Sequence, residues 1–298
     1  MFYLKAFFFS ASLLFVLLLG FVHAIDPYEK YGINLFGLKT KSAGLARELK
    51  FNMLEQSKKE YQAFIVGSSS VQGLHTAQVE KLTGLKTFNY AVGQTTPEDQ
   101  LAITRHIFSS ATPKLLLLQI DLSALNKKAV SITETSYFSV SALVDSYTVL
   151  SANLSGPGNS LYLEDGNLKP EKSGRKRIKL RKINYSGFVF SPERIKALKS
   201  IKALCNANKV KVIAWTAPVS RQHYQRIVEN PESNRTLGDF KKTLVGIFGE
   251  VHDFTNEDVS RYNDTKYFQD STHPTKYLFK VMVEEMLGGE ATFGRKLK

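Results

Sequence analysis

One short stretch near the start of the sequence constrains the fold more than any other. Residues 62–73 read QAFIVGSSSVQG, in which four apolar residues end at Gly67 and three serines follow. A short continuous apolar run of this kind is typical of a strand that is buried on both faces of a sheet. The residues after the serines can begin a helix. The serines therefore stand at a predicted strand-to-helix turn.

Two interpretations of this turn are open. Serine side chains often cap a helix by accepting a hydrogen bond from an unpaired backbone N–H, so Ser68 or Ser69 can be a simple cap. Alternatively, the turn presents a nucleophilic hydroxyl beside backbone N–H groups and a helix dipole that favour negative charge. Taken alone, the turn favours the cap, and the rest of the chain has to decide between the two.

The first 25 residues form a separate segment. Residues 6–25 carry no charged side chain, and at about 1.5 Å per residue they are long enough to cross a hydrocarbon core. Lys5 and the free N-terminus favour leaving the first residues in the cytoplasm and translocating the rest of the chain. Residues 22–24 (VHA) also resemble a signal-peptide cleavage site. We favour an uncleaved anchor in the cytoplasmic membrane, because the run is longer than most signal-peptide cores. Secretion after cleavage at Ala24 is the alternative, and both interpretations place the body outside the cytoplasm, facing the periplasm.

After a connector with a helix at residues 26–60, short apolar runs alternate with helical patterns. We expect the main strands and helices, in chain order, at residues 63–66, 86–91, 97–110, 114–120, 192–207, 209–216, 237–248, 251–254 and 274–287. Short turns in such an alternation favour parallel strands joined by right-handed helical crossovers. The predicted fold class is α/β, a three-layer α/β/α sandwich with a mainly parallel five-stranded sheet. It spans residues 61–290 and leaves a tail at 291–298.

The alternation is interrupted between residues 122 and 190, which we interpret as an insertion. A helix is expected at 139–154, and residues 169–182 (KPEKSGRKRIKLRK) carry eight Lys or Arg against one Glu, in a chain of net charge +13. Such a run is usually a solvated loop, although it can also attract anionic lipid or an acidic polymer. We expect no nucleic acid partner, because a translocated protein rarely meets one and the run lacks interleaved aromatic residues.

Several classes of site have no support in the sequence. Cys205 is the only cysteine, so an intramolecular disulfide cannot form. No spacing of His, Cys or acidic residues matches a known metal motif, and no glycine-rich nucleotide loop is present. We therefore expect no metal and no cofactor. Trp215, the only tryptophan, ends a predicted strand and is expected in the core, with a place in the cleft as the alternative.

A second motif lies close to the C-terminus. Residues 267–274 read YFQDSTHP, so Asp270 and His273 are three positions apart just before the last predicted helix. At this spacing the carboxylate can accept a hydrogen bond from one imidazole nitrogen, which leaves the other nitrogen to take a proton from a serine. A single D-x-x-H is a weak signal, because Asp270 can equally cap the helix.

Taken together, the turns resemble the SGNH or GDSL hydrolase superfamily. A Gly-Ser-Ser turn follows the first strand, residues 89–96 (NYAVGQTT) follow the second, and D-x-x-H precedes the last helix, all in the order of that family. The G-S-S form is nearest to envelope proteins of polysaccharide and teichoic-acid modification. The resemblance implies that Ser69 is the nucleophile and that His273 and Asp270 are its triad partners. It also implies that the Gly93 N–H donates to the oxyanion and that the Asn89 side chain binds substrate.

One block departs from the family pattern. Many members have a G-x-N-D turn after the third strand, whose Asn donates to the oxyanion, but residues 119–123 read QIDLS here. An ionised Asp121 accepts hydrogen bonds and opposes a nearby negative charge. Losing one oxyanion donor costs about 2.7–4 kcal/mol of transition-state stabilisation. Either Gln119, Ser123 or Asn126 supplies the missing donor, or the chain is no longer an enzyme.

The resemblance implies an extracytoplasmic serine esterase or O-acyltransferase that acts on an acylated cell-envelope glycan or polysaccharide. An integral-membrane protein that donates the acyl group is a conceivable partner, by analogy with envelope acetylation systems. The alternative function is a non-catalytic protein that binds glycan or assists assembly during polysaccharide synthesis or export. Acyl transfer and hydrolysis differ only in the second nucleophile, so the sequence does not separate them.

Overall fold

The computed structural model describes most of the chain as two compact units. The described residues are 2–28, 30–33, 35–36, 38, 46–57, 60–129, 140–154, 165–167, 187–260, 262, 265–289 and 294–298. Unit 1 comprises Met1–Ser57 and Thr133–Glu164, and unit 2 comprises Lys58–Ile132 and Asp165–Lys298. Part of the predicted insertion therefore groups with the N-terminal segment, and each unit is considered by itself. The basic run at 169–182 lies outside the described residues.

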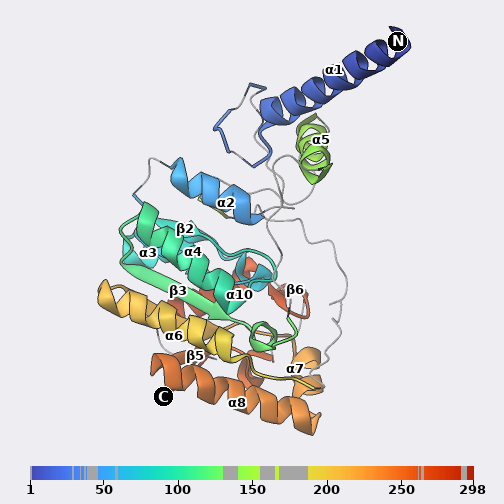
Figure 1. Ribbon diagram of the computed structural model, residues 1–298. Helices are drawn as coiled ribbons and strands as arrows, with labels where there is room; N and C mark the ends of the chain where they lie inside the picture. The colour runs from blue at the N-terminus through green and yellow to red at the C-terminus, as the bar shows by residue number, and fades with distance from the viewer. Residues whose placement is uncertain are drawn as a thin grey trace. The chain divides into compact units, whose positions relative to one another are not determined.

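Unit 2 is built on a six-stranded sheet (Figure 1). Its strands, in spatial order, are β2 (Thr87–Asn89), β1 (Ala63–Val66), β3 (Leu115–Ile120), β4 (Lys211–Thr216), β5 (Val251–Asp253) and β8 (Arg295–Leu297). The first five are parallel to their neighbours, and β8 pairs antiparallel with β5. All five predicted strands are present. The predicted tail at 291–298 is corrected, because its last residues add the sixth strand.

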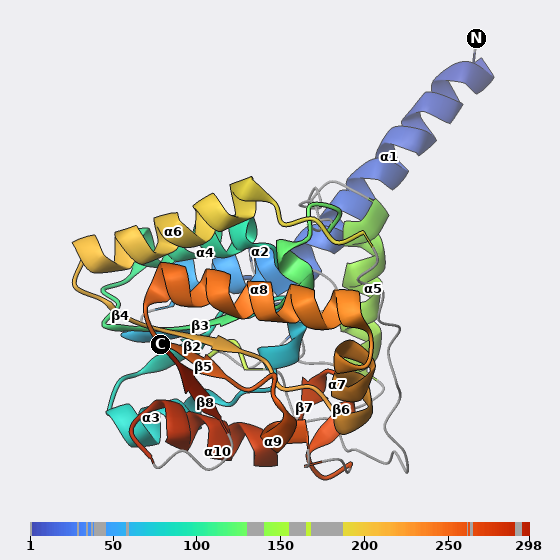
Figure 2. The same ribbon diagram turned by 90° about the horizontal axis from the view of Figure 1, so that it is seen from below.

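Helices cover both faces of this sheet, which gives the predicted three layers. Figure 2 shows one layer containing α4 (Pro97–Ser110), α6 (Pro192–Ala207) and α8 (Pro231–Phe248). The opposite layer contains α3 (Thr76–Thr83) and α10 (Lys276–Met286), with the short helix α9 (Glu257–Ser260) beside α10, while α7 (Arg221–Val228) lies near strands β6 (Phe268–Asp270) and β7 (His273–Pro274).

The three long helices begin alike, for a reason that is visible in the sequence. Each has a proline in its first turn, where the missing N–H is not needed. Each is also capped by a side-chain oxygen that accepts a hydrogen bond from a backbone N–H of the first turn. The capping residues are Thr96, Ser191 and Asn230 respectively. Helix α8 begins at Pro231 and not at the predicted residue 237, because the Asn230 cap and the proline start it earlier.

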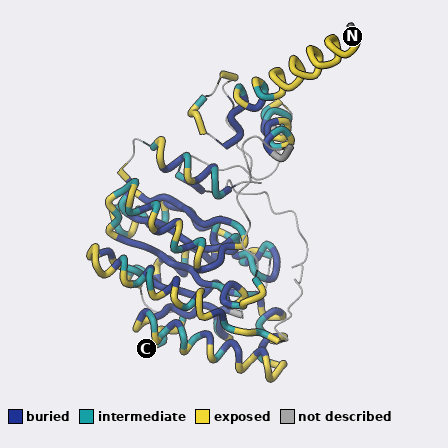
Figure 3. Tube along the Cα trace, viewed as in Figure 1, coloured by how far each residue is buried: buried dark blue, intermediate teal, exposed yellow. Residues whose placement is uncertain are grey.

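The strands supply the core. Strands β1, β2, β3 and β5 are buried at every position (Figure 3), as expected of strands covered on both faces. Trp215 is fully buried in the core cluster against Phe254, which confirms its predicted core position. Cys205 is also buried, and burial raises the pKa of its thiol to about 11.

A short segment clips onto the edge of the sheet at β2. The Asp165 carbonyl accepts a hydrogen bond from the Asn89 N–H at 2.9 Å. The Asn167 side chain accepts one from the Thr76 N–H at the start of α3, at 3.1 Å. Gly166, between them, has a left-handed backbone with φ of +75°, and a Cβ there would lie 2.3 Å from the Asn89 carbonyl oxygen. Only glycine allows the two backbones to approach so closely.

The described part of unit 1 contains three helices, α1 (Phe2–Ile25), α2 (Ala46–Glu55) and α5 (Val140–Leu154). Helix α5 falls within one residue of the helix predicted at 139–154. The segment Tyr3–Ile25 of α1 is long and apolar enough to cross a membrane. Among the described residues, no other helix meets that criterion.

The Gly166 clip leads to a testable prediction about folding. We expect Gly166→Ala to destabilise unit 2 by the cost of a left-handed alanine, about 1–2 kcal/mol, plus an overpacking cost of about 1–3 kcal/mol. Gly84→Ala is the matched control, because Gly84 has a similar φ of +69° with no atom within 4 Å of an added Cβ. Urea denaturation measures both variants. Equal losses of stability would show that the close approach at Gly166 contributes nothing.

Candidate active site

Three parts of unit 2 that are distant in sequence meet near the carboxyl ends of the strands. The first is the 3₁₀ turn η1 (Ser69–Val71), which directly follows β1, and the second is the turn after β2. The third is a small antiparallel hairpin of β6 (Phe268–Asp270) and β7 (His273–Pro274), which carries the D-x-x-H residues. The predicted elements include no strand between residues 255 and 273, where most of this hairpin lies. Loops at the carboxyl ends of parallel strands are the usual location of ligand sites in such sheets.

The three serines of the first turn have different partners. The Ser68 side chain accepts from the Ser70 N–H and caps η1, and the Ser68 and Ser70 hydroxyls lie 2.8 Å apart. Ser69 Oγ instead lies 3.0 Å from His273 Nε2, across 204 positions of sequence. The cap interpretation is therefore correct for Ser68, and Ser69 is the hydroxyl that points to the histidine.

Gly67 and Gln119 fix the position of the serine turn. Gln119 Oε1 accepts a hydrogen bond from the Ser68 N–H at 2.9 Å. An added Cβ on Gly67 would lie 2.6 Å from that same oxygen and 2.6 Å from Val71 Cγ2. The glycine is therefore required by the close packing of the turn against β3.

The histidine is oriented by a carboxylate. Asp270 Oδ1 lies 2.8 Å from His273 Nδ1, and the same oxygen accepts hydrogen bonds from the backbone N–H groups of Thr272 and His273. These donors hold the carboxylate in place. With the Nδ1 proton directed to Asp270, Nε2 carries a lone pair that faces Ser69 Oγ. The arrangement suits proton abstraction from the serine.

Two backbone N–H groups lie in the turns that frame Ser69. Among the described residues, the N–H groups of Ser69 and Gly93 have no hydrogen-bond acceptor. Both residues are half-buried. The turn that holds Gly93 is anchored to the serine turn, since the Val92 N–H and the Thr95 hydroxyl both donate to the Gly67 carbonyl. These two N–H groups are the candidate donors to an oxyanion.

Asn89 does not face this space, which corrects the expectation of a substrate-binding side chain. It is fully buried, and its amide nitrogen donates to the carbonyls of Val71, Gln72 and Leu74. Its side-chain oxygen accepts from the Ala91 N–H. Asn89 therefore braces the segment after Ser69. The reason is that its position in β2 lies beside that segment in the parallel sheet.

The replacements considered for the missing third-block Asn also have other roles. Gln119 is fully buried, with Oε1 bonded to Ser68 and Nε2 donating to Asp121 Oδ1 at 2.7 Å. Ser123 is exposed in the 3₁₀ turn η2 (Ser123–Leu125), and no described contact joins it to Ser69 or His273. The Asn126 side chain accepts from the Lys128 N–H. Gln119 thus positions the serine turn, and one of its two amide N–H groups is bonded to Asp121.

Asp121 is the unusual group of the site. It is half-buried just after β3, and burial raises its pKa above the usual value for an aspartate, while hydrogen bonds from Ser68 and Gln119 and the nearby His273 oppose that rise. The carboxyl is therefore within electrostatic range of the histidine. When protonated it can donate a hydrogen bond, and when ionised it opposes negative charge on a substrate oxygen.

A supporting layer behind Asp270 was not found from the sequence. Ser271 is fully buried, its carbonyl accepts from the Ser220 N–H at 3.0 Å, and its hydroxyl lies 3.2 Å from His223 Nδ1. Helix α7 and the β6–β7 hairpin lie side by side in Figure 2. No spacing in the sequence links residues 220–223 to Ser271, so only the fold brings them together.

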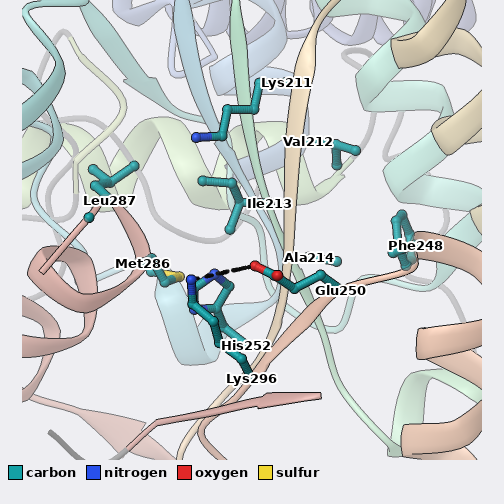
Figure 4. Close-up of a pocket in the computed structure, with 11 residues that line it drawn as sticks. Lys211, Val212, Ile213, Ala214, Phe248, Glu250, His252, Met286, Leu287 and Lys296 are labelled. Carbon is teal, nitrogen blue, oxygen red and sulfur yellow. Dashed lines mark ion pairs between the residues drawn. The ribbon is translucent and has the colours of Figure 1, made fainter. Parts of the chain in front are cut away.

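A separate cavity lies at the opposite, amino end of the strands and contains none of these groups. It measures about 240 Å³ and is lined by the first residues of β4, with His252, Glu250 and Lys296 at its centre (Figure 4). His252 Nε2 lies 3.8 Å from Glu250 Oε1, and burial lowers the pKa of His252. No cluster of His, Cys, Asp and Glu able to hold a metal ion is found among the described residues.

Comparisons with known proteins give likeness in structure only. No protein-family model matches the sequence, and no curated protein is similar at a significant level. A GDSL-like lipase from Bacteroides thetaiotaomicron is 13% identical, with 78% of this chain and 90% of that chain covered and a TM-score of 0.40. TesA is 11% identical, with coverage of 76% and 96% and a TM-score of 0.41. LAE5, an alpha/beta hydrolase enzyme from the metagenome of Lake Arreo in Spain, is 14% identical, with coverage of 76% and 95% and a TM-score of 0.42.

Proposed function

We propose that this chain is a membrane-anchored serine esterase or O-acyltransferase. One observation carries the proposal: Ser69 Oγ lies 3.0 Å from His273 Nε2, while His273 Nδ1 lies 2.8 Å from Asp270. Serine, imidazole and carboxylate in this order activate a hydroxyl for attack on a carbonyl.

The proposed reaction has two halves. His273 Nε2 takes the Ser69 proton as Oγ bonds to the carbonyl carbon of an ester, and the N–H groups of Ser69 and Gly93 donate to the oxyanion. The tetrahedral intermediate collapses, and the departing alkoxide takes the proton from Nε2. Water or a sugar hydroxyl then gives its proton to His273 and attacks the acyl-serine. Ser69 leaves and recovers that proton.

We propose that the substrate is an acylated cell-envelope glycan outside the cytoplasm. Support comes from the apolar helix α1, which fits an anchor that translocates the rest of the chain. It also comes from the resemblance of the Gly-Ser-Ser turn to envelope proteins that modify polysaccharides. A membrane protein that supplies the acyl group is the partner this proposal expects.

A second candidate function is glycan binding or assembly without catalysis. Asp121 favours it, because the carboxyl stands where many family members carry an Asn donor, and the Gln119 amide that could replace the Asn is already bonded to Asp121. In that case the serine turn would be a remnant of an ancestral site, and the glycan would bind without being cleaved.

Labelling by a fluorophosphonate probe distinguishes the two functions. We expect the full-length protein in detergent to be labelled, and Ser69→Ala to abolish labelling and lower p-nitrophenyl acetate hydrolysis by at least about 10³-fold. Ser70→Ala is the matched control and should keep both activities, because its hydroxyl bonds to Ser68 and not to His273. Folded wild-type protein that resists the probe, with glycan binding intact in Ser69→Ala, would support the non-catalytic function.

Asp121→Asn tests the electrostatics of the oxyanion space. An Asn at this position can donate at every pH, whereas the native carboxyl donates only when protonated. We expect the variant to raise kcat/KM by about tenfold or more near neutral pH, within the 2.7–4 kcal/mol that one oxyanion donor contributes. Since the Asp121 pKa is raised, the advantage should be small in acid and should grow as pH rises through that pKa.

The control for this variant is Asp165→Asn, which changes another carboxylate of unit 2 that bonds to Thr76 and Asn167. Its pH–rate profile should follow that of the wild type. An Asp121→Asn profile that runs parallel to the wild type at all pH values would place Asp121 outside the reacting centre.

A further inference from the structure

The C-terminal end of α1 is covered by a helix from the middle of the chain. Val22 and Tyr28 form one buried apolar cluster with Ala142 of α5, and Ile25 and Leu38 form another with Val149, all within unit 1. The Tyr28 hydroxyl donates to Asp145 Oδ2 at 2.9 Å. Figures 1 and 2 both show the two helices side by side at this end of α1. Ala142, Asp145 and Val149 repeat at helical spacing, so one face of α5 serves this contact.

The composition of α5 is unusual for a helix in water. Asp145 is its only charged residue in 15 positions, and that carboxylate is bonded to Tyr28. Three polar side chains of α5 donate to the backbone carbonyl four positions earlier, namely those of Ser146, Thr148 and Asn153. Polar groups that bond back to their own helix in this way need no water. The helix therefore suits an apolar environment.

The other face of α5 carries large apolar side chains that nothing in the described part of unit 1 covers. Val144, Tyr147 and Leu154 are 56%, 68% and 78% exposed. Outside α1, seven of the ten large apolar side chains that are exposed in the described residues belong to unit 1. Exposed apolar surface is thus concentrated in the unit that carries the apolar helix α1. Such a concentration marks an interaction surface.

The connector after α1 adds to the same surface. Asp26 has a left-handed backbone with φ of 44°, and its carboxylate accepts hydrogen bonds from the N–H groups of Lys30, Tyr31 and Ile33. The chain therefore turns sharply at the end of α1. Leu35 and Phe36, just beyond this turn, are 70% and 61% exposed. Tyr31, within the turn, is 45% exposed, and Tyr is one of the two residue types enriched at the level of the lipid headgroups.

From these observations we propose that α5 is a second membrane-contacting element. It lies in the interfacial layer of the bilayer against the end of an uncleaved α1, with Val144 and Tyr147 directed to lipid. The inference rests on the membrane anchor of the proposed function and adds a lipid-binding surface inside the segment that interrupts unit 2. At 15 residues, or about 22 Å, α5 is too short to cross a core of about 30 Å, so it lies in the interface and does not span it.

The contact also bears on the fate of α1. Cleavage after Ala24 would remove Val22 from the cluster that it forms with Tyr28 and Ala142. It would also break the hydrogen bond from the Asp26 N–H to the Val22 carbonyl. Retention of α1 keeps this contact and holds α5 at the membrane. The chain then meets the bilayer twice, once at its N-terminus and once at α5.

Depth-dependent fluorescence quenching tests the proposal. Single cysteines at Tyr147 and, as a second reporter, Val144 would carry an environment-sensitive dye in the full-length protein, reconstituted in phosphatidylcholine vesicles with nitroxide-labelled lipid. The native Cys205 is buried with a pKa of about 11 and should remain unlabelled. We expect nitroxides near the headgroups to quench both reporters about twofold or more strongly than nitroxides at the chain ends, since interfacial helices lie about 5–10 Å deep.

Two further positions complete the test. A label at Leu14, 58% exposed in α1, should show the reverse depth order, and a label at Leu82, 46% exposed in α3, should not be quenched. Quenching at Leu14 with none at Tyr147 and Val144 would overturn the lipid contact of α5 while leaving the anchor intact. Absence of quenching at Leu14 as well would overturn the anchor itself. Intact mass of the membrane-extracted protein should include residues 1–24, and a mass lacking them would refute retention of α1.

Discussion

The site depends on one imidazole, which joins two parts of the chain that are distant in sequence. His273 contacts Ser69 through one nitrogen and Asp270 through the other, across 204 positions in the first case and three in the second. The short-range contact forms within the β6–β7 hairpin, whereas the long-range contact forms only when the sheet has brought the turn after β1 to that hairpin. Parallel strands make this feasible, because their carboxyl ends meet at one edge and bring the turn after β1 to the hairpin before α10.

Interactions around the imidazole limit the freedom of each partner. Gln119 holds the Ser68 N–H, Asn89 braces the segment after Ser69, and several donors converge on Asp270. Both amides were expected at the substrate and instead support the backbone. A buried amide satisfies its hydrogen-bonding groups where it can, and at these positions the nearest partners are backbone groups of the serine turn. Asp121 is a second carboxyl group near the histidine, besides Asp270, and when ionised it opposes negative charge on a substrate oxygen.

The sequence predicted the five parallel strands well, because each is a short apolar run buried on both faces and so gives a strong local signal. It also predicted Ser69, His273 and Asp270 as neighbours, through the order of the motifs. It could not predict the sixth strand, since β8 is short, largely exposed and gains its structure from pairing with β5. The support of Ser271 by His223 was missed for a related reason, because it exists only after α7 and the hairpin have come together. In unit 1, the helix at 140–154 was expected, but its contact with the end of α1 was not.

In the proposed reaction, Ser69 carries the acyl group during turnover. This role of Ser69 is tested most directly by mixing the full-length protein with p-nitrophenyl acetate, stopping the reaction in acid within the first turnover and mapping the acetylated peptide by mass spectrometry. We expect one hydroxylamine-sensitive acetyl group on Ser69, and none there in a His273→Ala variant, which lacks the base that deprotonates the hydroxyl. An acetyl group found only on other residues, or present on Ser69 equally without His273, would contradict the account.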